Sequence, residues 1–188
     1  DVNLFIPSEC CTGSEIYTHG NEMNEMRKRK ESCFDVCSSQ VFHNHNHYYH
    51  DNHHFGEIDI LLFDKTKFHR ANFIFLTKQK YFENTQFYRV IDNFIVQAGN
   101  SDDRATARKR AKIGKYLLPT DTKRGYTHER GVISMPSSEI DNPHKLASPF
   151  EFFIVQQQGG AHFLDGDYTI FGKVIRGMDV IDKIAAVD

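Results

Sequence analysis

"FYRVIDNFIVQAGN", residues 87–100, places a permanently charged guanidinium among apolar side chains. Two short apolar runs meet at Asp92-Asn93, with Arg89 inside the first run and Gln97 inside the second. Because Asp and Asn are typical of tight turns, the pattern predicts two strands that form a hairpin. A strand residue that pairs with a nearby carboxylate is the ordinary explanation of Arg89, and a functional cation is the alternative.

The composition limits the class of protein. The 188 residues carry a formal net charge of −2 and are 39% hydrophobic, which suits one globular domain with an appendage. A charge so close to zero provides no overall field for a nucleic acid, and no apolar run approaches the ~20 residues of a membrane span. The basic runs at 27–30 and 108–112 are interpreted as solvated helix faces.

Residues 1–42 are predicted to be an N-terminal extension, because they lack sustained periodicity apart from a charged segment at 21–34. They hold all four cysteines, for which two disulfides, free thiols and a metal site stay open as alternatives: Cys10, Cys11, Cys33 and Cys37. The clustered cysteines and a start at Asp1 rather than Met favour an exported or periplasmic protein over a cytoplasmic one, and the compartment stays unknown.

The tract HNHNHYYHDNHH, residues 43–54, is predicted to be a His-rich linker and holds six of the eleven histidines. Histidine is a common ligand of transition metals, and His43, His45 and His47 would share one face of an extended chain. A flexible low-complexity tract supplies no fixed geometry, however. An exposed polar linker and a metal-binding or pH-sensing segment therefore stay open as alternatives.

Residues 55–188 are predicted to form the folded domain. The alternation in EIDILLF, residues 57–63, indicates a half-buried strand with Ile58, Ile60 and Leu62 on one face. Asp102 and Asp103 precede a helix-compatible segment at 104–118, where acids suit the positive end of an extra helix.

A helix is predicted for KFHRANFIFLTKQ, residues 67–79, with Asp64 or Thr66 available as a cap. The apolar spacing in this segment predicts that one face carries Phe68, Ala71, Asn72, Phe75 and Leu76.

The second half of the domain continues the strand-rich pattern. GVISM at 131–135 and FEFFIV at 150–155 indicate strands, and FLDGDYTIFGKV at 163–174 indicates a hairpin that turns at Asp165-Gly166. The periodicity of GMDVIDKIAAV at 177–187 predicts a closing helix. Many strands with a helix near each end favour a mainly-β protein, an antiparallel barrel capped by helices.

Three segments in register resemble the cyclophilin-type peptidyl-prolyl cis-trans isomerases. Residues 87–100 resemble F-H-R-V-I-x-x-F-M-x-Q-G-G-D, HERGVISMPSS resembles H-x-x-G-x-L-S-M-A-N, and FEFFIV with FLDGDYTIFGKVIRGMDVID resembles the Q-F-F-I and W-L-D-G sequences of the family. The resemblance covers residues 56–187 and indicates a divergent, bacterial-like member. It implies a closed antiparallel eight-stranded β-barrel capped by two α-helices. The family's last strand follows its last helix, and we expect this strand to be missing, which leaves either a truncated chain or an open edge.

The resemblance also implies a function and a site. Arg89 matches the arginine that stabilises the twisted Xaa-Pro amide, and Gln97 matches a residue that positions the arginine or the substrate carbonyl. The reaction needs no nucleophile, no proton transfer and no cofactor. The matched positions that would bind the substrate are Phe94, Ile95, Gln97, Pro136, Ser137, Glu151, Phe153, Phe163, Leu164 and Tyr168.

Five of these positions depart from the family pattern. Pro136-Ser137 replaces Ala-Asn and is expected to alter the backbone strip that grips the residue before proline. Glu151 replaces a glutamine and is expected to bring a negative charge near Arg89. Phe163 and Tyr168 replace the frequent tryptophan and histidine, so we expect weak cyclosporin binding at most.

We therefore expect a prolyl isomerase that acts on Pro-containing peptides and on unfolded or flexible protein clients. The alternative is a catalytically weak cyclophilin-like module that binds Pro-containing segments, with metal binding by the His-rich tract. A monomer is expected in both cases, without a nucleic-acid partner.

Overall fold

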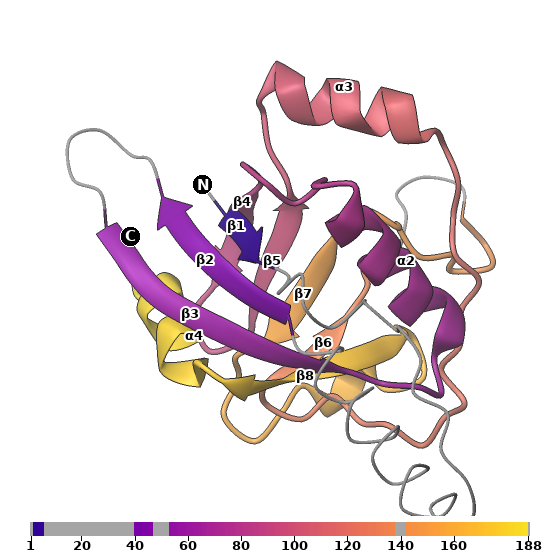
Figure 1. The fold of residues 1–188 in the computed structure, drawn as a ribbon. Helices are drawn as coiled ribbons and strands as arrows, with labels where there is room; N and C mark the ends of the chain where they lie inside the picture. The colour runs from indigo at the N-terminus through magenta and orange to yellow at the C-terminus, as the bar shows by residue number, and fades with distance from the viewer. Residues whose placement is uncertain (1, 6–39, 47–52, 138–141, 188) are drawn as a thin grey trace, which may run out of the picture.

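The computed structural model describes residues 2–5, 40–46, 53–137 and 142–187, and its main element is a curled sheet (Figure 1). Eight antiparallel strands follow the order β1-β2-β3-β8-β6-β7-β5-β4. The strands are β1 Val2–Phe5, β2 Gln40–Asn46, β3 His53–Leu62, β4 Gln86–Ile91, β5 Ile95–Asn100, β6 Val132–Ser134, β7 Phe152–Val155 and β8 Ile170–Arg176. The helices are α2 Lys67–Lys78, α3 Arg104–Ile113, the 3₁₀ turn η2 His162–Leu164, and α4 Met178–Ala185.

The sheet begins with strands from the segment that the sequence analysis assigned to an extension and a linker. β1 pairs with β2, and β2 pairs with β3, with His45 opposite His54. Both ends of the His-rich tract therefore lie in strands. The remainder of the tract, the four cysteines and the charged segment at 21–34 lie outside the described residues.

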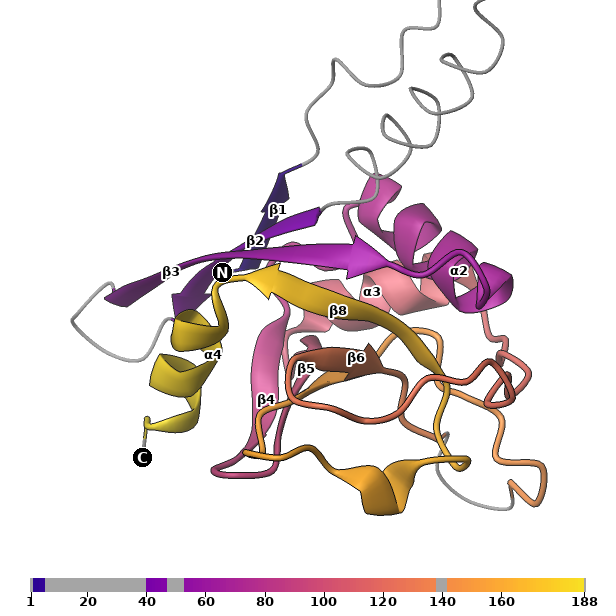
Figure 2. The same ribbon diagram turned by 90° about the horizontal axis from the view of Figure 1, so that it is seen from below.

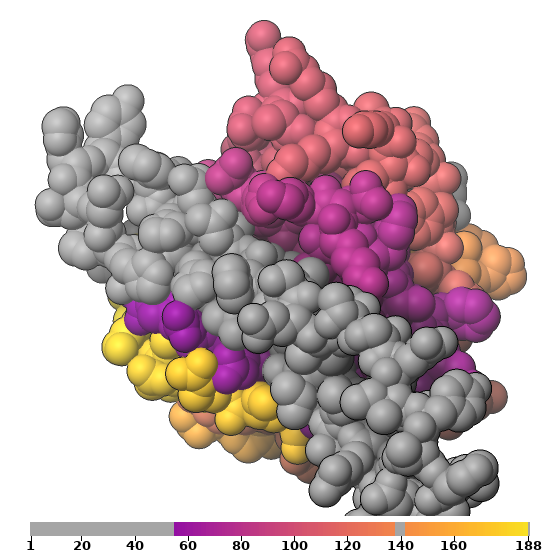
Figure 3. Space-filling view, in the orientation of Figure 1, coloured from indigo at the N-terminus to yellow at the C-terminus, as the bar shows by residue number. Residues whose placement is uncertain are grey.

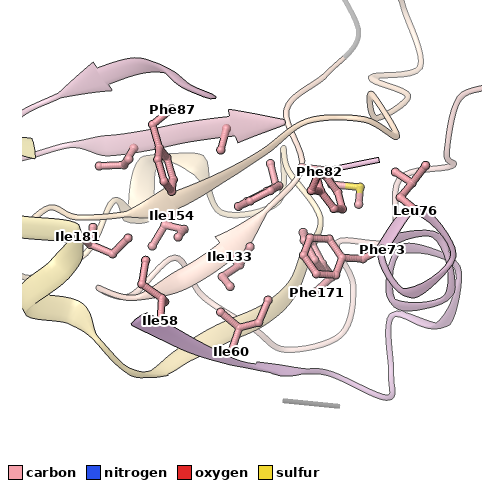
Figure 4. Packing of buried hydrophobic residues seen from close by; sticks show 14 of the residues in the cluster. Ile58, Ile60, Phe73, Leu76, Phe82, Phe87, Ile133, Ile154, Phe171 and Ile181 are labelled. Carbon is pink, nitrogen blue, oxygen red and sulfur yellow. The ribbon is translucent and has the colours of Figure 1, made fainter. Parts of the chain in front are cut away.

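The predicted strand at 57–63 is confirmed, because it lies within β3 and buries its alternate residues. Ile58 and Ile60 are fully buried and Leu62 is 3% exposed. Figure 4 shows Ile58 and Ile60 pointing into an interior that they share with residues of β7, α2 and α4. This core fixes one face of the sheet, so its other face is available for a site.

The predicted helix at 67–79 is confirmed as α2, but its predicted face is wrong in part. Asn72 and Leu76 are buried, whereas Phe68 is 65% and Phe75 46% exposed. The neighbouring residue Phe73 is buried instead, with its ring centroid 5.0 to 5.5 Å from those of Phe82, Phe152 and Phe171. Packing against this aromatic cluster determined the orientation of the helix, and it cannot be read from the spacing of α2 alone.

The two other predicted helices are also present, although α3 ends at Ile113 and not at 118. Asp103 precedes α3 and its carboxylate accepts a hydrogen bond from the backbone N–H of Ala105 at 3.0 Å, which caps the helix. α4 buries Val180, Ile181 and Ile184 against the sheet. Figures 1 and 2 show α2 at one end of the curled sheet and α4 at the opposite end. No helix in the described part of the chain is long and apolar enough to cross a membrane.

The predicted hairpin at 163–174 is wrong. The residues before Asp165 form the 3₁₀ turn η2, and only the second arm forms a strand, β8. The Asp165 carboxylate is used for a long-range contact, since it accepts hydrogen bonds from the backbone N–H and ring Nδ1 of His128 at 2.7 and 2.8 Å. The Asp165-Gly166 pair still lies in a turn, with the Asp167 N–H bonded to the Leu164 carbonyl at 3.1 Å, but this turn follows η2 and does not join two paired strands.

Closure of the sheet into an eight-stranded barrel is not seen in the described residues. The pairing order ends at β1 on one side and at β4 on the other. The edge strand β4 carries Arg89, so the proposed functional arginine lies beside one border of the sheet.

Candidate active site

A β-bulge in β4 aims two neighbouring side chains at Gln97. Phe87 lies opposite Ala98 and Arg89 lies opposite Gln97, so Tyr88 is the extra residue in β4. A bulge of this kind breaks the alternation of the strand and re-aims a side chain. Tyr88 and Arg89 consequently both reach Gln97 on the neighbouring strand.

One row of residues crosses four strands of the sheet. Arg89 lies opposite Gln97, Gln97 opposite Phe153, and Phe153 opposite Ser134. Directly opposed residues place their side chains on the same face of a sheet. Val96, Ala98 and Ile154 point to the other face and belong to the main core. The sheet therefore separates the core from the face that carries Arg89 and Phe153.

Gln97 is held between a cation and a phenol. Its Oε1 accepts a hydrogen bond from Arg89 Nη1 at 3.4 Å, and its Nε2 donates to the hydroxyl of Tyr88. Gln97 is 6% exposed, while Arg89 is exposed and forms no salt bridge with any described carboxylate. The guanidinium therefore lies on the open face of the sheet without a described carboxylate partner.

Beside this polar group lies a small apolar cluster, separate from the main core. Ile95 and Phe153 are buried in it, and Phe94, Leu164 and Tyr168 are partly buried against it. The rings of Phe153 and Tyr168 meet edge to face with centroids 5.7 Å apart. Phe163 is 68% exposed and stacks on Phe94 at 5.5 Å. Six of the predicted substrate-binding residues are thus brought together.

A buried histidine supports this apolar cluster from behind. The His128 ring lies parallel to that of Phe153, with an interplanar angle of 12° and centroids 6.1 Å apart. It is fixed by Asp165 on one side and by the Ser134 hydroxyl, 3.3 Å from Nε2, on the other. Burial lowers the pKa of His128, against the opposing effect of Asp165, so the ring is neutral near pH 7.

Glu151 is paired with a cation other than Arg89. Arg110 on α3 donates from Nη2 to Glu151 Oε1 at 3.0 Å. The same guanidinium donates from Nε to the Tyr81 hydroxyl at 2.8 Å and lies 5.2 Å from the centroid of the Phe150 ring. The expected negative charge near the site is therefore compensated by a residue of α3.

Pro136 and Ser137 lie beyond the end of β6, and the contacts recorded for them are made with another loop. The Pro136 carbonyl accepts a hydrogen bond from the N–H of Ser148 at 2.9 Å, and Ser137 forms an isolated bridge with Ala147. Both residues are half-buried. These contacts do not bring them into the apolar cluster around Phe153.

Sequence reasoning missed three residues of this site. Arg110 lies in a basic run that was interpreted as a solvated face; Arg108 and Lys112 are indeed exposed, but Arg110 is half-buried. His128 lies inside the quoted HERGVISM segment, and its spacing from Ser134 was the available signal. Tyr88 directly precedes Arg89, but only the bulge reveals that it faces Gln97.

Comparison with known proteins identifies the family of this chain. The model of the "Cyclophilin type peptidyl-prolyl cis-trans isomerase/CLD" family matches residues 48–188. The chain therefore belongs to the cyclophilin-type peptidyl-prolyl cis-trans isomerase family, and peptidyl-prolyl cis-trans isomerase is its enzyme class. The match begins at Tyr48, inside the His-rich tract.

Individual relatives agree with this family. The chain is 33% identical over 138 residues to a peptidyl-prolyl cis-trans isomerase of Acinetobacter baylyi, covering 70% of this chain and 68% of that protein. It is 29% identical over 144 residues to peptidyl-prolyl cis-trans isomerase B of Escherichia coli, covering 74% of this chain and 83% of that protein.

A solved structure shares the fold. The crystal structure of a cyclophilin-type peptidyl-prolyl cis-trans isomerase of Cryptosporidium parvum matches with a TM-score of 0.56 and 26% identity. The match covers 71% of this chain and 80% of that chain. The same Cryptosporidium protein was also solved in the presence of the dipeptide Ala-Pro, again with a TM-score of 0.56 and 26% identity, covering 71% and 82% of the two chains.

Proposed function

We propose that this isomerase accelerates rotation about Xaa-Pro peptide bonds through the guanidinium of Arg89. Amide resonance sets a barrier of ~18–20 kcal/mol, so the uncatalysed step takes tens of seconds or longer. The resonance is lost in the twisted transition state, and the lone pair returns to the proline nitrogen. A fixed cation aimed at that nitrogen binds the twisted state better than either planar state.

The observation that carries the proposal is the environment of the Arg89 guanidinium. Its guanidinium is exposed, is free of a described carboxylate and is bound to the buried amide of Gln97. A solvated strand arginine needs no such partner. The fixed amide reduces the rotamers of Arg89 and leaves its remaining donors for the substrate.

The apolar cluster is the proposed seat of the proline ring. Phe153 forms its buried floor, and Phe94, Leu164 and Tyr168 form its partly exposed walls. The pairing of Gln97 with Phe153 places polar and apolar side chains next to each other on one face. Pro-containing peptides and flexible protein clients fit this arrangement, and cyclosporin binding is proposed to be weak because Phe163 offers no ring N–H donor.

The test is the cis-to-trans rate of a short Xaa-Pro peptide with wild type and Arg89→Ala at equal concentration. We expect the variant to lose ~100-fold or more in kcat/KM, in the range seen when an electrostatic donor is removed from an active site. Equal rates for the two proteins would remove Arg89 from the mechanism.

A second candidate function is a recognition module with weak turnover. The occupied Pro136 carbonyl favours it, because this backbone group is already bound to Ser148 and Pro136 has no N–H to offer a peptide. Peptide binding in a nuclear magnetic resonance titration without accelerated isomerisation would select this function. We also propose that the protein is a monomer and that its curled sheet closes into an eight-stranded barrel.

A further inference from the structure

Both ends of the η2 turn are fastened to one buried residue, His128. Before the turn, the backbone N–H of Ala161 donates to the His128 carbonyl at 2.7 Å. After the turn, the Asp165 carboxylate accepts from the His128 N–H at 2.7 Å and from its ring Nδ1 at 2.8 Å. Figure 2 shows this turn, drawn in orange, at the lower border of the molecule. His128 therefore holds η2 from both sides.

Gly160 allows the loop before η2 to approach His128 closely. Its φ of 85° lies in the left-handed region that favours glycine. A Cβ at this position would lie 2.6 Å from the His128 carbonyl oxygen and 3.0 Å from Nε2 of His162. The loop thus passes His128 at a distance that a side chain would prevent, which is a second feature that fixes η2 on this histidine.

The Asp165 carboxylate is shared between the two histidines. One oxygen accepts from His128, and the other lies 3.2 Å from Nδ1 of His162, the first residue of η2. Burial raises the pKa of Asp165, but the hydrogen bonds from the two histidines together lower it below its usual range, so the carboxyl group is ionised near pH 7. An ionised carboxylate can only accept, so the ring proton of His128 lies on Nδ1.

The elements that Asp165 joins are two sides of the apolar cluster. η2 carries Phe163, which stacks on Phe94, and Leu164, which packs against the cluster. The His128 ring lies parallel to Phe153, the buried floor, with centroids 6.1 Å apart. Apolar contact has no preferred direction, whereas a hydrogen bond restricts both distance and angle. The bonds of Asp165 therefore fix the separation between wall and floor.

We propose that Asp165 is a positioning residue that holds the η2 wall at the width of a proline ring from the Phe153 floor, and so determines the ring size that the site accepts. This inference rests on the proposed seat of the proline ring and adds the group that sets its width. A ring that is one methylene larger would have to push η2 outward and stretch the hydrogen bonds to His128.

Peptides with proline or its six-membered homologue, pipecolic acid, after the isomerised bond test this width. We expect wild type to prefer proline ~10-fold or more in kcat/KM, as a single methylene commonly allows. Asp165→Ala should raise KM for the proline peptide ~5-fold with kcat within ~2-fold, and should reduce the preference to ~3-fold or less. A wild type without a preference, or a preference that Asp165→Ala leaves unchanged, would overturn the proposal.

Asp165→Asn is the rescue variant. Its amide oxygen can accept both hydrogen bonds of His128 while its NH₂ group faces the His162 ring, so KM and the proline preference should stay within ~2-fold of wild type. Full loss of the preference in Asp165→Asn would contradict the role of Asp165 as a shared acceptor and overturn the proposal.

Asp103→Ala is the matched control, because the Asp103 carboxylate also accepts from a backbone N–H. It lies at the start of α3, the helix that projects at the upper border of the molecule in Figure 3. This variant should lose stability through its missing helix cap but keep the KM and the ring preference of wild type. An equal rise of KM in Asp103→Ala would trace the effect to a general loss of stability and overturn the proposal.

The position of the His128 ring proton gives a readout that does not depend on turnover. In Asp165→Ala, Nδ1 loses its acceptor, so the proton should move to Nε2, where the Ser134 oxygen lies at 3.3 Å in the wild type. Nuclear magnetic resonance of the ring nitrogens distinguishes the two tautomers. A proton that stays on Nδ1 in Asp165→Ala would show that Asp165 does not hold this ring, and would overturn the proposal.

The proposed seat and the role of Asp165 can fail separately. If Tyr168→Ala leaves KM unchanged and wild type accepts both rings equally, the seat itself is wrong. If Tyr168→Ala raises KM and Asp165→Ala changes neither KM nor the ring preference, the seat stands and only the role of Asp165 is wrong.

Discussion

The hydroxyl of Tyr81 donates to the carbonyl of Gly99 at 2.7 Å, which connects the turn after α2 to β5 in the interior. The same hydroxyl accepts from Arg110 Nε at 2.8 Å, and the Tyr81 side chain is fully buried. One oxygen therefore joins three segments that are distant in sequence.

Removal of that oxygen should destabilise the protein. We expect Tyr81→Phe to lower the free energy of unfolding by about 2 kcal/mol, because the Gly99 carbonyl and Arg110 Nε each lose a buried hydrogen bond with this hydroxyl. Urea denaturation measures the change. Tyr126→Phe is the control, since the Tyr126 hydroxyl has no described hydrogen bond and its ring stacks on Phe63; equal losses in both variants would contradict the assignment.

Charge alone should not replace the guanidinium of Arg89. Arg89→Lys keeps the positive charge but lacks the rigid fork that holds Gln97 while it donates to a substrate. We expect kcat/KM to fall ~10-fold or more, between wild type and Arg89→Ala. A protease-free assay of cis-trans exchange in an Xaa-Pro peptide gives kcat/KM for wild type, Arg89→Lys and Arg89→Ala. Full activity of Arg89→Lys would show that the shape of the guanidinium is unimportant and that its charge is sufficient.

The apolar cluster should control binding rather than the chemical step. Tyr168→Ala removes a partly buried ring that meets Phe153 edge to face. We expect KM to rise ~5- to 10-fold with kcat nearly unchanged, because contact with the proline ring is the same in the planar and twisted states. A fall in kcat at constant KM would mean that Tyr168 stabilises the twisted transition state instead.

Acid should destabilise the fold through His69. Both ring nitrogens of this fully buried histidine have no described hydrogen-bond partner, and burial lowers its pKa from 6.5 to about 4, against the charge of Asp121. The contribution of the neutral His69 ring to the free energy of unfolding is complete above pH 6.5. It is lost as the pH falls toward 4, because the unfolded chain binds the proton more readily than the folded protein. The loss reaches about 3 kcal/mol.

The variant His69→Leu isolates this effect. The difference in unfolding free energy between wild type and His69→Leu should shift by that amount from pH 7 to pH 4, measured by urea denaturation. His144 is exposed, and His144→Gln is the control for a histidine substitution outside the core. A flat difference for His69→Leu would mean that its ring finds a partner.

Gly177 is required at the start of α4 for two separable reasons. Its φ of 92° is unfavourable for other residues, and a Cβ there would lie 2.3 Å from the Glu57 carbonyl oxygen. We expect Gly177→Ala to lower the free energy of unfolding by about 3 kcal/mol. Gly166→Ala has a similar φ of 84° without a contact, so it should lose about 1 kcal/mol, and equal losses would exclude the steric contribution.

The sequence predicted those features that depend on local periodicity or on a matched motif. The alternation of apolar residues predicted β3, and the acidic residues before 104 predicted the start of α3 at the Asp103 cap. The cyclophilin resemblance predicted that Phe94, Phe153 and Tyr168 belong to one site, and these residues share one apolar cluster. The first two signals are carried by neighbouring residues, and the third by motifs that are each contiguous in sequence.

Features that depend on distant partners could not be predicted in the same way. The Asp165-Gly166 pair looked like a hairpin turn because the sequence does not show that His128 binds the carboxylate. The buried face of α2 depends on where Phe82 and Phe171 pack. No local signal marks a bulge at Tyr88, and only a register shift against β5 turns this residue toward Gln97.

The β4–β5 hairpin has a further consequence for how the protein acquires its activity during folding. Arg89, Phe94 and Gln97 lie on this one hairpin, and hairpins of this size form in ~1–10 μs with little entropy of loop closure. Phe153 can join them only after β7 has paired with β5, which requires contacts across a long stretch of chain. The cation and its amide partner are therefore expected to meet early in folding, and the apolar seat that gives them a substrate is expected to assemble later.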